Sequence, residues 1–186
     1  HNVSVSCATD NRCSSICRNS GISCNDMFHH CFAYSHCIDR ICSLICTETY
    51  NSFDPSIERG VEVEILLGHK GDNLISEVST AREVYNLARR GAKVWLCKEC
   101  FHHDKVMIVD DSLCTVGTAN LDARSLSFDY EVNAYFFSPE YCSQLNAYFD
   151  IHRETAVMLT EDNWKELYPR SKRRLGWWTK GIRGIL

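Results

Sequence analysis

The first fifty residues of this 186-residue chain contain almost none of the leucine, lysine and proline that the remainder uses. Lysine is absent until Lys70, proline is absent until Pro55, and Leu44 is the only leucine in this stretch. Eight of the twelve cysteines lie here instead, at Cys7, Cys13, Cys17, Cys24, Cys31, Cys37, Cys42 and Cys46. This shift in composition predicts a separate Cys-rich segment over residues 1–56, which we leave without an assigned fold.

Long apolar runs and a surplus of positive charge are also missing. No run reaches the roughly 18 apolar residues of a membrane-spanning helix, and no charged stretch followed by an apolar one marks a signal peptide. The net charge of −4 argues against a nucleic-acid binder held by overall charge, because neutralising phosphates takes an excess of lysine and arginine. With 45% hydrophobic and 24% charged residues, the composition is that of a globular protein.

The Cys-rich segment allows three interpretations. Its cysteines, with His29, His30 and His36 among them, could form disulfides or hold zinc. A poorly ordered extension fits equally well, because serine, asparagine and cysteine replace the core leucine and valine. The spacing does not decide between these alternatives.

Beyond residue 57, strand patterns alternate with helical ones, which predicts an α/β fold. Gly91 is expected just past the end of the first helix, with Asp72 as its N-cap, and Thr160 is expected to cap the last one. The turn Asp110-Asp111-Ser112 is expected to join two strands into a hairpin. The expected strands are 61–67, 92–97, 103–109, 113–117 and 130–137, and the expected helices are 73–90, 139–152 and a short one from Thr160.

One stretch carries the chemistry. His103, Lys105 and Asp110 form an HxKxxxxD pattern, and the block Gly117-Thr118-Ala119-Asn120 follows. If 103–109 is a strand, His103 and Lys105 share one face, and Asn120 can bring an amide beside them. This cluster suits a phosphate diester: a neutral His103 attacks phosphorus, while Lys105 and Asn120 stabilise the non-bridging oxygens.

This pattern resembles the HxKxxxxD…G(S/T)xN motif of the phospholipase D superfamily. The stretch HHDKVMIVDDSLCTVGTANLDARSLSFDYEVNAYFF is similar to the carboxy-terminal half of bacterial cardiolipin synthases. The resemblance implies a mixed sheet flanked by helices over residues 57–169, with no metal or other cofactor. It also implies that Glu131 orients His103. We expect Asp110 to hold the turn, and Gly117, Thr118 and Arg124 to bind substrate.

The resemblance implies a phosphatidyltransferase that moves a phosphatidyl group between two phosphatidylglycerols through a phosphohistidine and releases glycerol. In-line displacement needs a second group to protonate the leaving alkoxide, yet the sequence contains a single HxK motif. We therefore expect a homodimer or a second motif-bearing half. The alternatives are a homodimeric phosphodiesterase acting on lipid or nucleic acid, and a non-catalytic or metal-binding half-enzyme. Nucleic acid is not favoured.

Two further features complete the expectations. Residues 170–186 hold six basic side chains, no acid, and Trp177 and Trp178, which predicts a tail that attaches the protein peripherally to the cytoplasmic face of an anionic membrane. A solvated terminus with the two aromatic rings packed on the body is the alternative. The pair Cys97 and Cys100 could bind metal or form a redox pair, but we do not favour either, and we read Cys114 and Cys142 as small core residues.

The resemblance also marks a gap. Related halves begin with an apolar strand and a helix before the strand at 61–67, and the Cys-rich segment takes their place here. If that strand is an inner one, the sheet is expected to lose hydrogen-bond partners.

Overall fold

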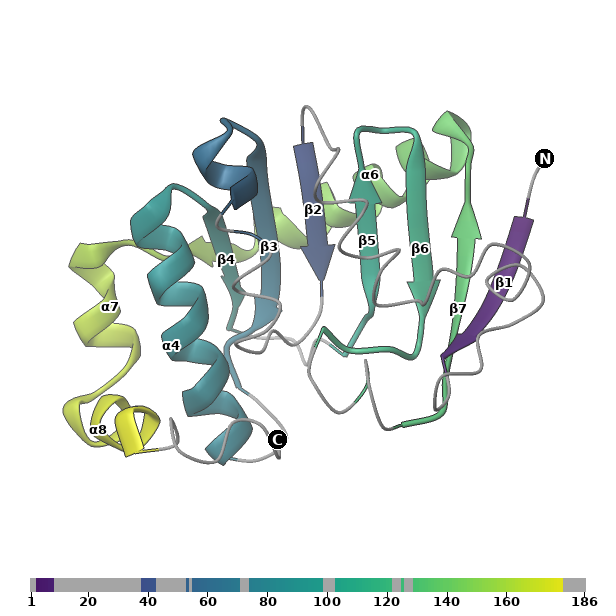
Figure 1. Cartoon of the computed structure of the whole chain (residues 1–186). Coiled ribbons are helices and arrows are strands. Elements are labelled where there is room, and N and C mark those ends of the chain that lie inside the picture. The colour runs from purple at the N-terminus through teal and green to yellow at the C-terminus, as the bar shows by residue number, and fades with distance from the viewer. Residues whose placement is uncertain are drawn as a thin grey trace.

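A computed structural model describes residues 3–8, 38–42, 53, 55–70, 74–98, 103–121, 125 and 129–178. In this part of the chain, eight strands form one sheet with helices on both of its faces (Figure 1). The described strands are β1 Val3–Ala8, β2 Ile38–Cys42, β3 Glu62–Gly68, β4 Lys93–Cys97, β5 Val106–Val109, β6 Leu113–Gly117, β7 Glu131–Phe136 and β8 Ala156–Met158. The described helices are α4 Leu74–Arg90, α6 Pro139–Glu154, α7 Glu161–Leu167 and α8 Arg170–Trp178.

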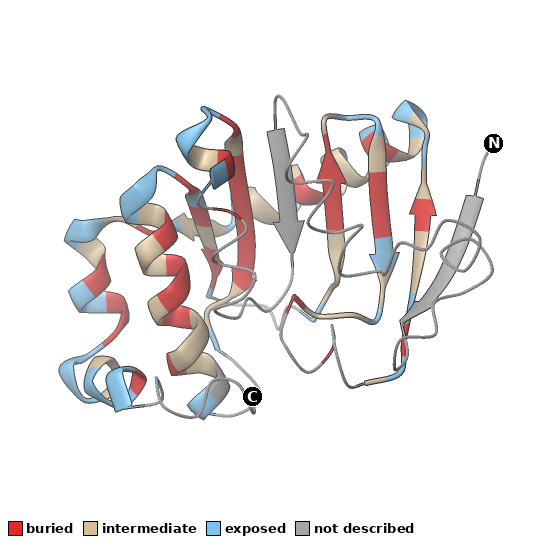
Figure 2. Cartoon of the chain, in the orientation of Figure 1, coloured by how far each residue is buried: buried red, intermediate tan, exposed pale blue. Residues whose placement is uncertain are grey.

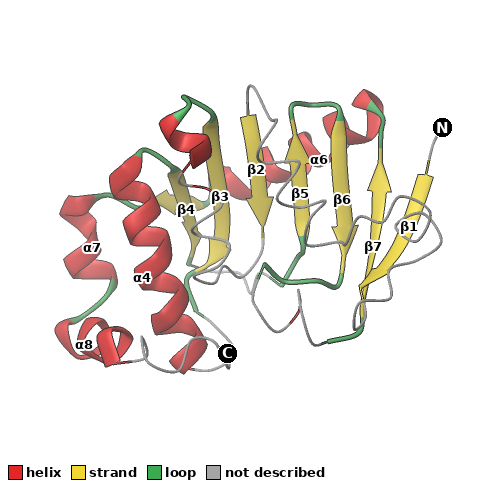
Figure 3. Cartoon of the chain, in the orientation of Figure 1, coloured by secondary structure: helices red, strands yellow, loops and turns green. Residues whose placement is uncertain are grey.

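The sheet is mixed, as expected. Its strand order is β1-β7-β6-β5-β2-β3-β4-β8, in which β2, β3 and β4 run parallel and all other neighbours run antiparallel. Figure 3 shows the strands side by side, with α4 and α7 in front of the sheet and α6 behind it. The α/β class and the mixed sheet flanked by helices are therefore confirmed.

The expectation of a missing inner strand is wrong. Strand β2 comes from the Cys-rich segment and lies between β3 and β5, pairing with both of them. Strand β1 comes from the same segment and pairs with β7 at the edge of the sheet. The segment therefore supplies the backbone hydrogen-bond partners that its composition does not reveal, while the boundaries at residues 56 and 169 stay predictions.

Strand β3 and helix α4 form where the sequence predicts them, because their apolar side chains repeat with the right period. Val63, Ile65 and Leu67 alternate along β3 and pack in the main core, which also contains Val84 and Leu87 of α4. Gly91 follows α4 with φ +114, a conformation that glycine adopts without steric cost, so it ends the helix as expected. The expected cap Asp72 lies outside the described residues.

The opposite face of the sheet packs against α6. Leu66 of β3 contacts Phe149 of α6 there, while Ile108 of β5 and Cys114 of β6 surround Cys142. Figure 2 shows buried residues along β3, β5 and β6 and on α4. Cys114 and Cys142 are fully buried thiols, so their reading as small core residues is confirmed.

The hairpin, the helix from Pro139 and the capped helix from Thr160 are also confirmed. Most predicted boundaries differ by one or two residues, but strand β5 begins at Val106 rather than at residue 103, and the sequence did not predict β8. Among the described residues, the pairing of β2 with β5 ends at Val106. Along the described chain, no helix combines the length and the hydrophobicity that spanning a bilayer requires.

Candidate functional site

The predicted site residues His103, Lys105, Gly117–Asn120 and Glu131 lie at one end of the strands, where the parallel strands β3 and β4 end, and we call this end the motif edge of the sheet. Strand β5 begins at this edge, β6 ends there, and β7 begins there (Figure 1). One line of paired residues crosses the sheet just inside it, through Trp95, Leu66, Cys42, Val106, Val116 and Ala134. In open α/β sheets, ligands bind beyond the carboxyl ends of the parallel strands, so this edge is the candidate active site.

His103 and Lys105 directly precede β5 in the chain, at the end where this strand begins. The Lys105 Nζ donates a hydrogen bond to the His103 carbonyl oxygen at 2.6 Å, and the Gly117 amide donates to the Lys105 carbonyl oxygen at 3.1 Å. The His103 side chain is exposed. The structure therefore keeps the ammonium beside the backbone of His103 and ties both to the end of β6, although these residues do not form the predicted strand.

Thr118 and Glu131 form a second connection across the edge. The Thr118 hydroxyl donates to Glu131 Oε2 and accepts a hydrogen bond from the Val132 amide at 3.0 Å. Glu131 is only 8% exposed, so one of its carboxylate oxygens is already held from inside the protein. The threonine therefore positions this carboxylate, a contact that the sequence did not predict.

Gly117 and Asn133 meet at the same point. They pair in the ladder between β6 and β7, and a Cβ added to Gly117 would lie 1.7 Å from Asn133 Oδ1. The same oxygen accepts a hydrogen bond from the Ala119 amide at 3.4 Å. Asn133 is a residue that sequence reasoning missed, and the signal for it was its spacing of two from Glu131, which puts both on one side of β7.

The register of strands β5, β6 and β7 relates the position of His103 to that of Glu131. Extending the pairing of β5 with β6 past Lys105 places His103 opposite Ala119, and extending that of β6 with β7 places Ala119 opposite Glu131. The backbone bond between Thr118 N and Val132 O, at 3.0 Å, follows the same register. By this extension of the register, the predicted nucleophile His103 and the carboxylate expected to orient it fall at one level of the sheet.

Asn120 and Arg124 complete the predicted set. Asn120 Oδ1 is buried and has no hydrogen-bond partner among the described residues, so a donor group could occupy this position with a gain in free energy. Arg124 lies outside the described residues.

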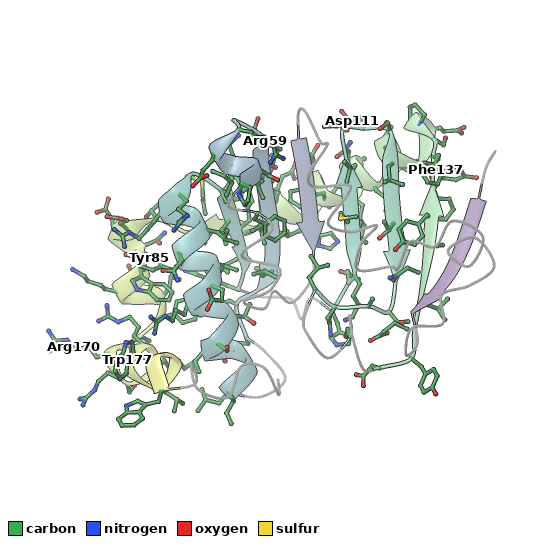
Figure 4. The ribbon with its side chains drawn as sticks, in the orientation of Figure 1. Arg59, Tyr85, Asp111, Phe137, Arg170 and Trp177 are labelled. Atoms are coloured by element: carbon green, nitrogen blue, oxygen red, sulfur yellow. The ribbon has the colours of Figure 1, made fainter. Side chains whose placement is uncertain are left out.

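Asp110 lies at the other end of the hairpin. With Asp111 it forms the turn after β5, at φ values of 49 and 52 (Figure 4, where Asp111 is labelled). Asn146 of α6 donates to the Asp111 carboxylate. The structure does not bring Asp110 to the edge that carries His103, and its place in the turn agrees with the expected holding role.

Asp104, the residue between His103 and Lys105, is hydrogen-bonded to helix α6. Its Oδ2 accepts a hydrogen bond from the Tyr148 hydroxyl of α6 at 2.8 Å. The residue between His103 and Lys105 is therefore fixed to the helix on the far face of the sheet. No local sequence pattern pointed to this contact, because Asp104 and Tyr148 are distant in the chain.

A second histidine lies at the same edge. His69 follows β3, and its amide donates to the Cys97 carbonyl oxygen at 2.9 Å. Its ring lies edge-on to Tyr168, with 5.2 Å between centroids, and its buried Nδ1 has no hydrogen-bond partner in the part of the chain that the structure describes. Burial lowers the pKa of His69 below its ordinary value, because the interior disfavours the charged imidazolium.

The Cys97–Cys100 pair is described only in part. Cys97 is buried, and its thiol donates to the His152 carbonyl oxygen, while Cys100 and the neighbouring His102 lie outside the described residues. Across the described ranges, no three histidine, cysteine or acidic side chains are grouped so that they could hold a metal ion.

Comparison with solved structures supports the fold. A phosphatidylserine synthase from Haemophilus influenzae Rd KW20 superposes with a TM-score of 0.74 at 17% identity, over 99% of this chain and 48% of that one. Nuc from Salmonella typhimurium, a phospholipase D family member, superposes with a TM-score of 0.68 at 15% identity, over 86% of this chain and 99% of that one. At these identities the likeness shows the fold alone.

Sequence comparison identifies the family. Cardiolipin synthase 1 from Bacillus cereus is 31% identical over 129 residues, which are 69% of this chain and 25% of that protein. The chain spans a quarter or less of the length of such curated relatives, 18% for a probable cardiolipin synthase of Bacillus subtilis. The model of the cardiolipin synthase, PLD-like domain matches residues 40–153, beginning inside β2 and including every motif position. The chain belongs to the family of cardiolipin synthase, phospholipase D-like domains.

Proposed function

We propose that this chain is the motif-bearing half of a phosphatidyltransferase, which transfers a phosphatidyl group from one phosphatidylglycerol to the hydroxyl of another and releases glycerol. The family match supports phosphodiester transfer or hydrolysis in general. The observation that carries the proposal is the gathering of His103, Lys105, the Gly117–Asn120 block and Glu131 at one edge of the sheet. Gly117 and Thr118 line the surface that contacts the substrate, and Arg124 is a further contact to the phosphate.

The first step is an in-line displacement at phosphorus. A ring nitrogen of neutral His103 forms the P–N bond as the P–O bond to the glycerol leaving group breaks. Lys105 Nζ and the Asn120 amide stabilise the charge that builds on the non-bridging oxygens. Glu131 accepts from the other ring nitrogen and stabilises the imidazolium, while Thr118 holds the carboxylate in place.

The second step reverses the first with a new acceptor. The hydroxyl of a second phosphatidylglycerol attacks the phosphohistidine, the P–N bond breaks, and the hydroxyl proton passes to a base. The same base, when protonated, gives its proton to the glycerol alkoxide in the first step. His103 cannot serve here while it is bonded to phosphorus, so another group is needed.

A second copy of the motif would supply that group. The sequence holds one HxK, so we propose that it comes from a homodimer or from another motif-bearing half of a longer protein. Sedimentation equilibrium of the active preparation tests this point. A strict monomer that still forms product would contradict the paired site.

The membrane location is part of the proposal. Trp177 and Trp178 of α8 are 63% and 75% exposed, next to the basic residues of the same helix. Such a helix suits the interface of an anionic bilayer, so we propose peripheral attachment at the cytoplasmic face.

The activity test uses the full chain with vesicles of phosphatidylglycerol. We expect cardiolipin and glycerol, resolved by chromatography and mass spectrometry. Peptide mapping carried out near neutral pH, because the P–N bond is labile in acid, should find the phosphatidyl adduct on the peptide that contains His103. His103→Ala should abolish both signals. His69→Gln, which changes a histidine at the same edge outside the motif, is the matched control. Product formation by His103→Ala would overturn the mechanism.

Hydrolysis is the second candidate. This chain spans 99% of the solved Nuc chain, so the phospholipase D fold occurs at this size in a single chain. In a homodimeric phosphodiesterase of this kind, water replaces the second lipid hydroxyl as the acceptor. Phosphatidic acid in place of cardiolipin in the assay would favour this function.

A further inference from the structure

Helices α4, α7 and α8 enclose a cavity of about 520 Å³ that is separate from the motif residues. This volume lies within the roughly 300–1,000 Å³ that small-molecule sites usually have. Five of its lining side chains are basic, and none is acidic: Arg82, Arg170, Lys172, Arg173 and Arg174. A cavity with this charge selects for an anionic ligand.

The cations around this cavity are only partly neutralised by the protein. Lys172 Nζ pairs with Glu77 Oε1 at 2.6 Å. The Arg173 Nε is buried and has no hydrogen-bond partner among the described residues. A buried donor without a partner is unfavourable, so a phosphate oxygen at this position would relieve a cost in free energy that the described residues leave in place.

The remaining wall is aromatic. The rings of Tyr85 and Trp164 are stacked with 4.3 Å between centroids, and Tyr168 lies against Trp164 at 4.7 Å. Trp177 lines the outer side and is largely exposed to solvent (Figure 4). Cations combined with apolar rings suit a ligand that has both a phosphate and an apolar part.

Helix α8 is held firmly enough to define this cavity. Gly176 is buried against α4, and a Cβ there would lie 2.7 Å from the Val78 carbonyl oxygen. One turn before Val78, Leu74 and Ile75 are exposed at the start of α4. Trp177 and Trp178 therefore extend an apolar surface at the same end of the molecule as the motif edge, where β3 leads into α4 (Figure 1).

We propose that this cavity binds the phosphate headgroup of an anionic phospholipid within a bilayer. Arg173 and Arg174 contact the phosphate, and the tryptophans enter the interface beside Leu74 and Ile75. Binding here turns the edge that carries His103 towards the lipid surface. The site does not include the motif, so it deepens the proposed membrane attachment without depending on the transfer chemistry.

The test measures partition of the full chain onto sedimented vesicles. Vesicles with phosphatidylglycerol should bind it, and vesicles of phosphatidylcholine alone should bind it weakly. The double variant Arg173→Gln/Arg174→Gln should weaken partition by roughly 30-fold, because each basic residue near an anionic surface contributes about a factor of five. Circular dichroism of the variant should match that of the parent chain.

The matched control is Arg59→Gln/Arg90→Gln, which removes two charges at the opposite end of the molecule, where Figure 4 labels Arg59. Its partition should stay within about threefold of the parent chain. Equal losses in the two double variants would show a general charge effect and would overturn the headgroup site. Substitution is a sharper test than deletion of residues 170–186, because deletion would also expose the face of α4 that α8 covers.

Three further measurements show what the cavity binds and whether this binding is separate from the proposed transferase activity. Soluble glycerol phosphate at millimolar concentration should not release the protein from vesicles, and release would mean that the cavity takes a free phosphate rather than a lipid. If Arg173→Gln/Arg174→Gln differs from the parent chain in oligomeric mass or thermal stability but not in partition, the occupant of the cavity is a second copy of the chain or residues 179–186. This result would overturn the proposal. His103→Ala should bind vesicles like the parent chain, which separates this site from the proposed transferase activity.

Discussion

Gly117 lies at the residue where β6 comes closest to a side chain of β7. A Cβ at this position would meet the Asn133 side chain at 1.7 Å and the Val132 carbonyl oxygen at 2.4 Å. Because one of these neighbours is backbone, the conflict cannot be relieved by a change of rotamer alone. Glycine is therefore required here by the close approach of two strands that also carry Thr118 and Glu131.

We expect Gly117→Ala to lower the free energy of unfolding by about 1–3 kcal/mol, as overpacking typically does, and to reduce transferase activity. Urea unfolding followed by circular dichroism measures the first effect. Val116→Ala, which shortens an exposed side chain on the same strand, is the control and should change stability by less. Equal stability of the Gly117→Ala variant and the parent chain would contradict the steric argument.

His69 makes stability depend on pH. Its pKa is lowered in the folded chain from the ordinary value of 6.5, chiefly by burial, with Lys172, Lys98 and Lys70 acting in the same direction and Glu77 opposing them. The unfolded chain therefore takes up the proton first as the pH falls. The stability that the neutral imidazole confers is present above the unfolded pKa and is lost as the pH drops through 6.5 towards the lower folded value.

Replacing His69 by phenylalanine should therefore make the free energy of unfolding depend less on pH. The fall in the free energy of unfolding between about pH 7 and about pH 5 should be smaller for His69→Phe than for the parent chain. Denaturant titrations at both pH values measure it. Parallel curves for the two proteins would rule out His69 as the source.

At the level of single residues, the sequence points to candidate reactive groups but not to the contacts that hold them. His103, Lys105 and Asn120 could be singled out because their types and spacing fit a family motif. The contacts of Thr118 with Glu131 and of Asp104 with Tyr148 could not, because each joins residues that only the folded sheet or helix brings together.

Among the elements, β6 and α6 meet through two thiols. Cys114 and Cys142 are buried side by side with Ile108. Burial raises the pKa of Cys114 to about 12 and also raises the pKa of Cys142. Since the thiolate is the reactive form, neither side chain should react in the folded protein.

Maleimide labelling with peptide mapping tests this expectation. Cys97, Cys114 and Cys142 should stay unlabelled at neutral pH and become labelled in concentrated guanidinium chloride. Ser112→Cys places a thiol in the exposed hairpin turn and should react at once, which shows that the reagent is active. Rapid labelling of Cys114 without denaturant would mean that α6 detaches from β6.

The elements that could be predicted are those whose signal is local. The alternating apolar residues of β3, the helical period of α4 and the Thr160 cap each lie within one short stretch, and the structure has all three. The start of β5 and the existence of β8 depend on which strands lie beside them. Strand β2 was hidden for the same reason, since its five residues carry a weak pattern and gain their place from β3 and β5.

For the whole molecule, β2 connects two groups of strands. It joins the parallel group with β3 and β4 to the antiparallel group from β5 to β7. Arg40 lies in the middle of β2 and pairs with Glu64 on one side and Ile108 on the other. The antiparallel group carries the motif residues, and α4, which lines the cavity proposed to bind lipid, follows the parallel strand β3, so β2 determines whether these parts act as one unit.

Arg40→Pro should therefore destabilise the whole chain. Proline cannot donate to the ladder and is not tolerated in an inner strand, so the loss should be a large part of the about 5–15 kcal/mol of a typical domain. Urea unfolding and near-ultraviolet circular dichroism measure it, and Arg40→Ala separates the loss of the side chain from the loss of the backbone donor. A proline variant as stable as the alanine variant would show that β2 is dispensable.

The pairing of β1 with β7 sets the order of folding. It joins Val3 to Phe136, so β1 cannot form its hydrogen bonds until the chain as far as β7 has been made. Closing so long a loop is slow, and sheets built from such distant pairs fold in milliseconds to seconds rather than in microseconds. Until β1 has docked, the edge of β7 is open to other chains, which makes the protein most prone to aggregation at that stage.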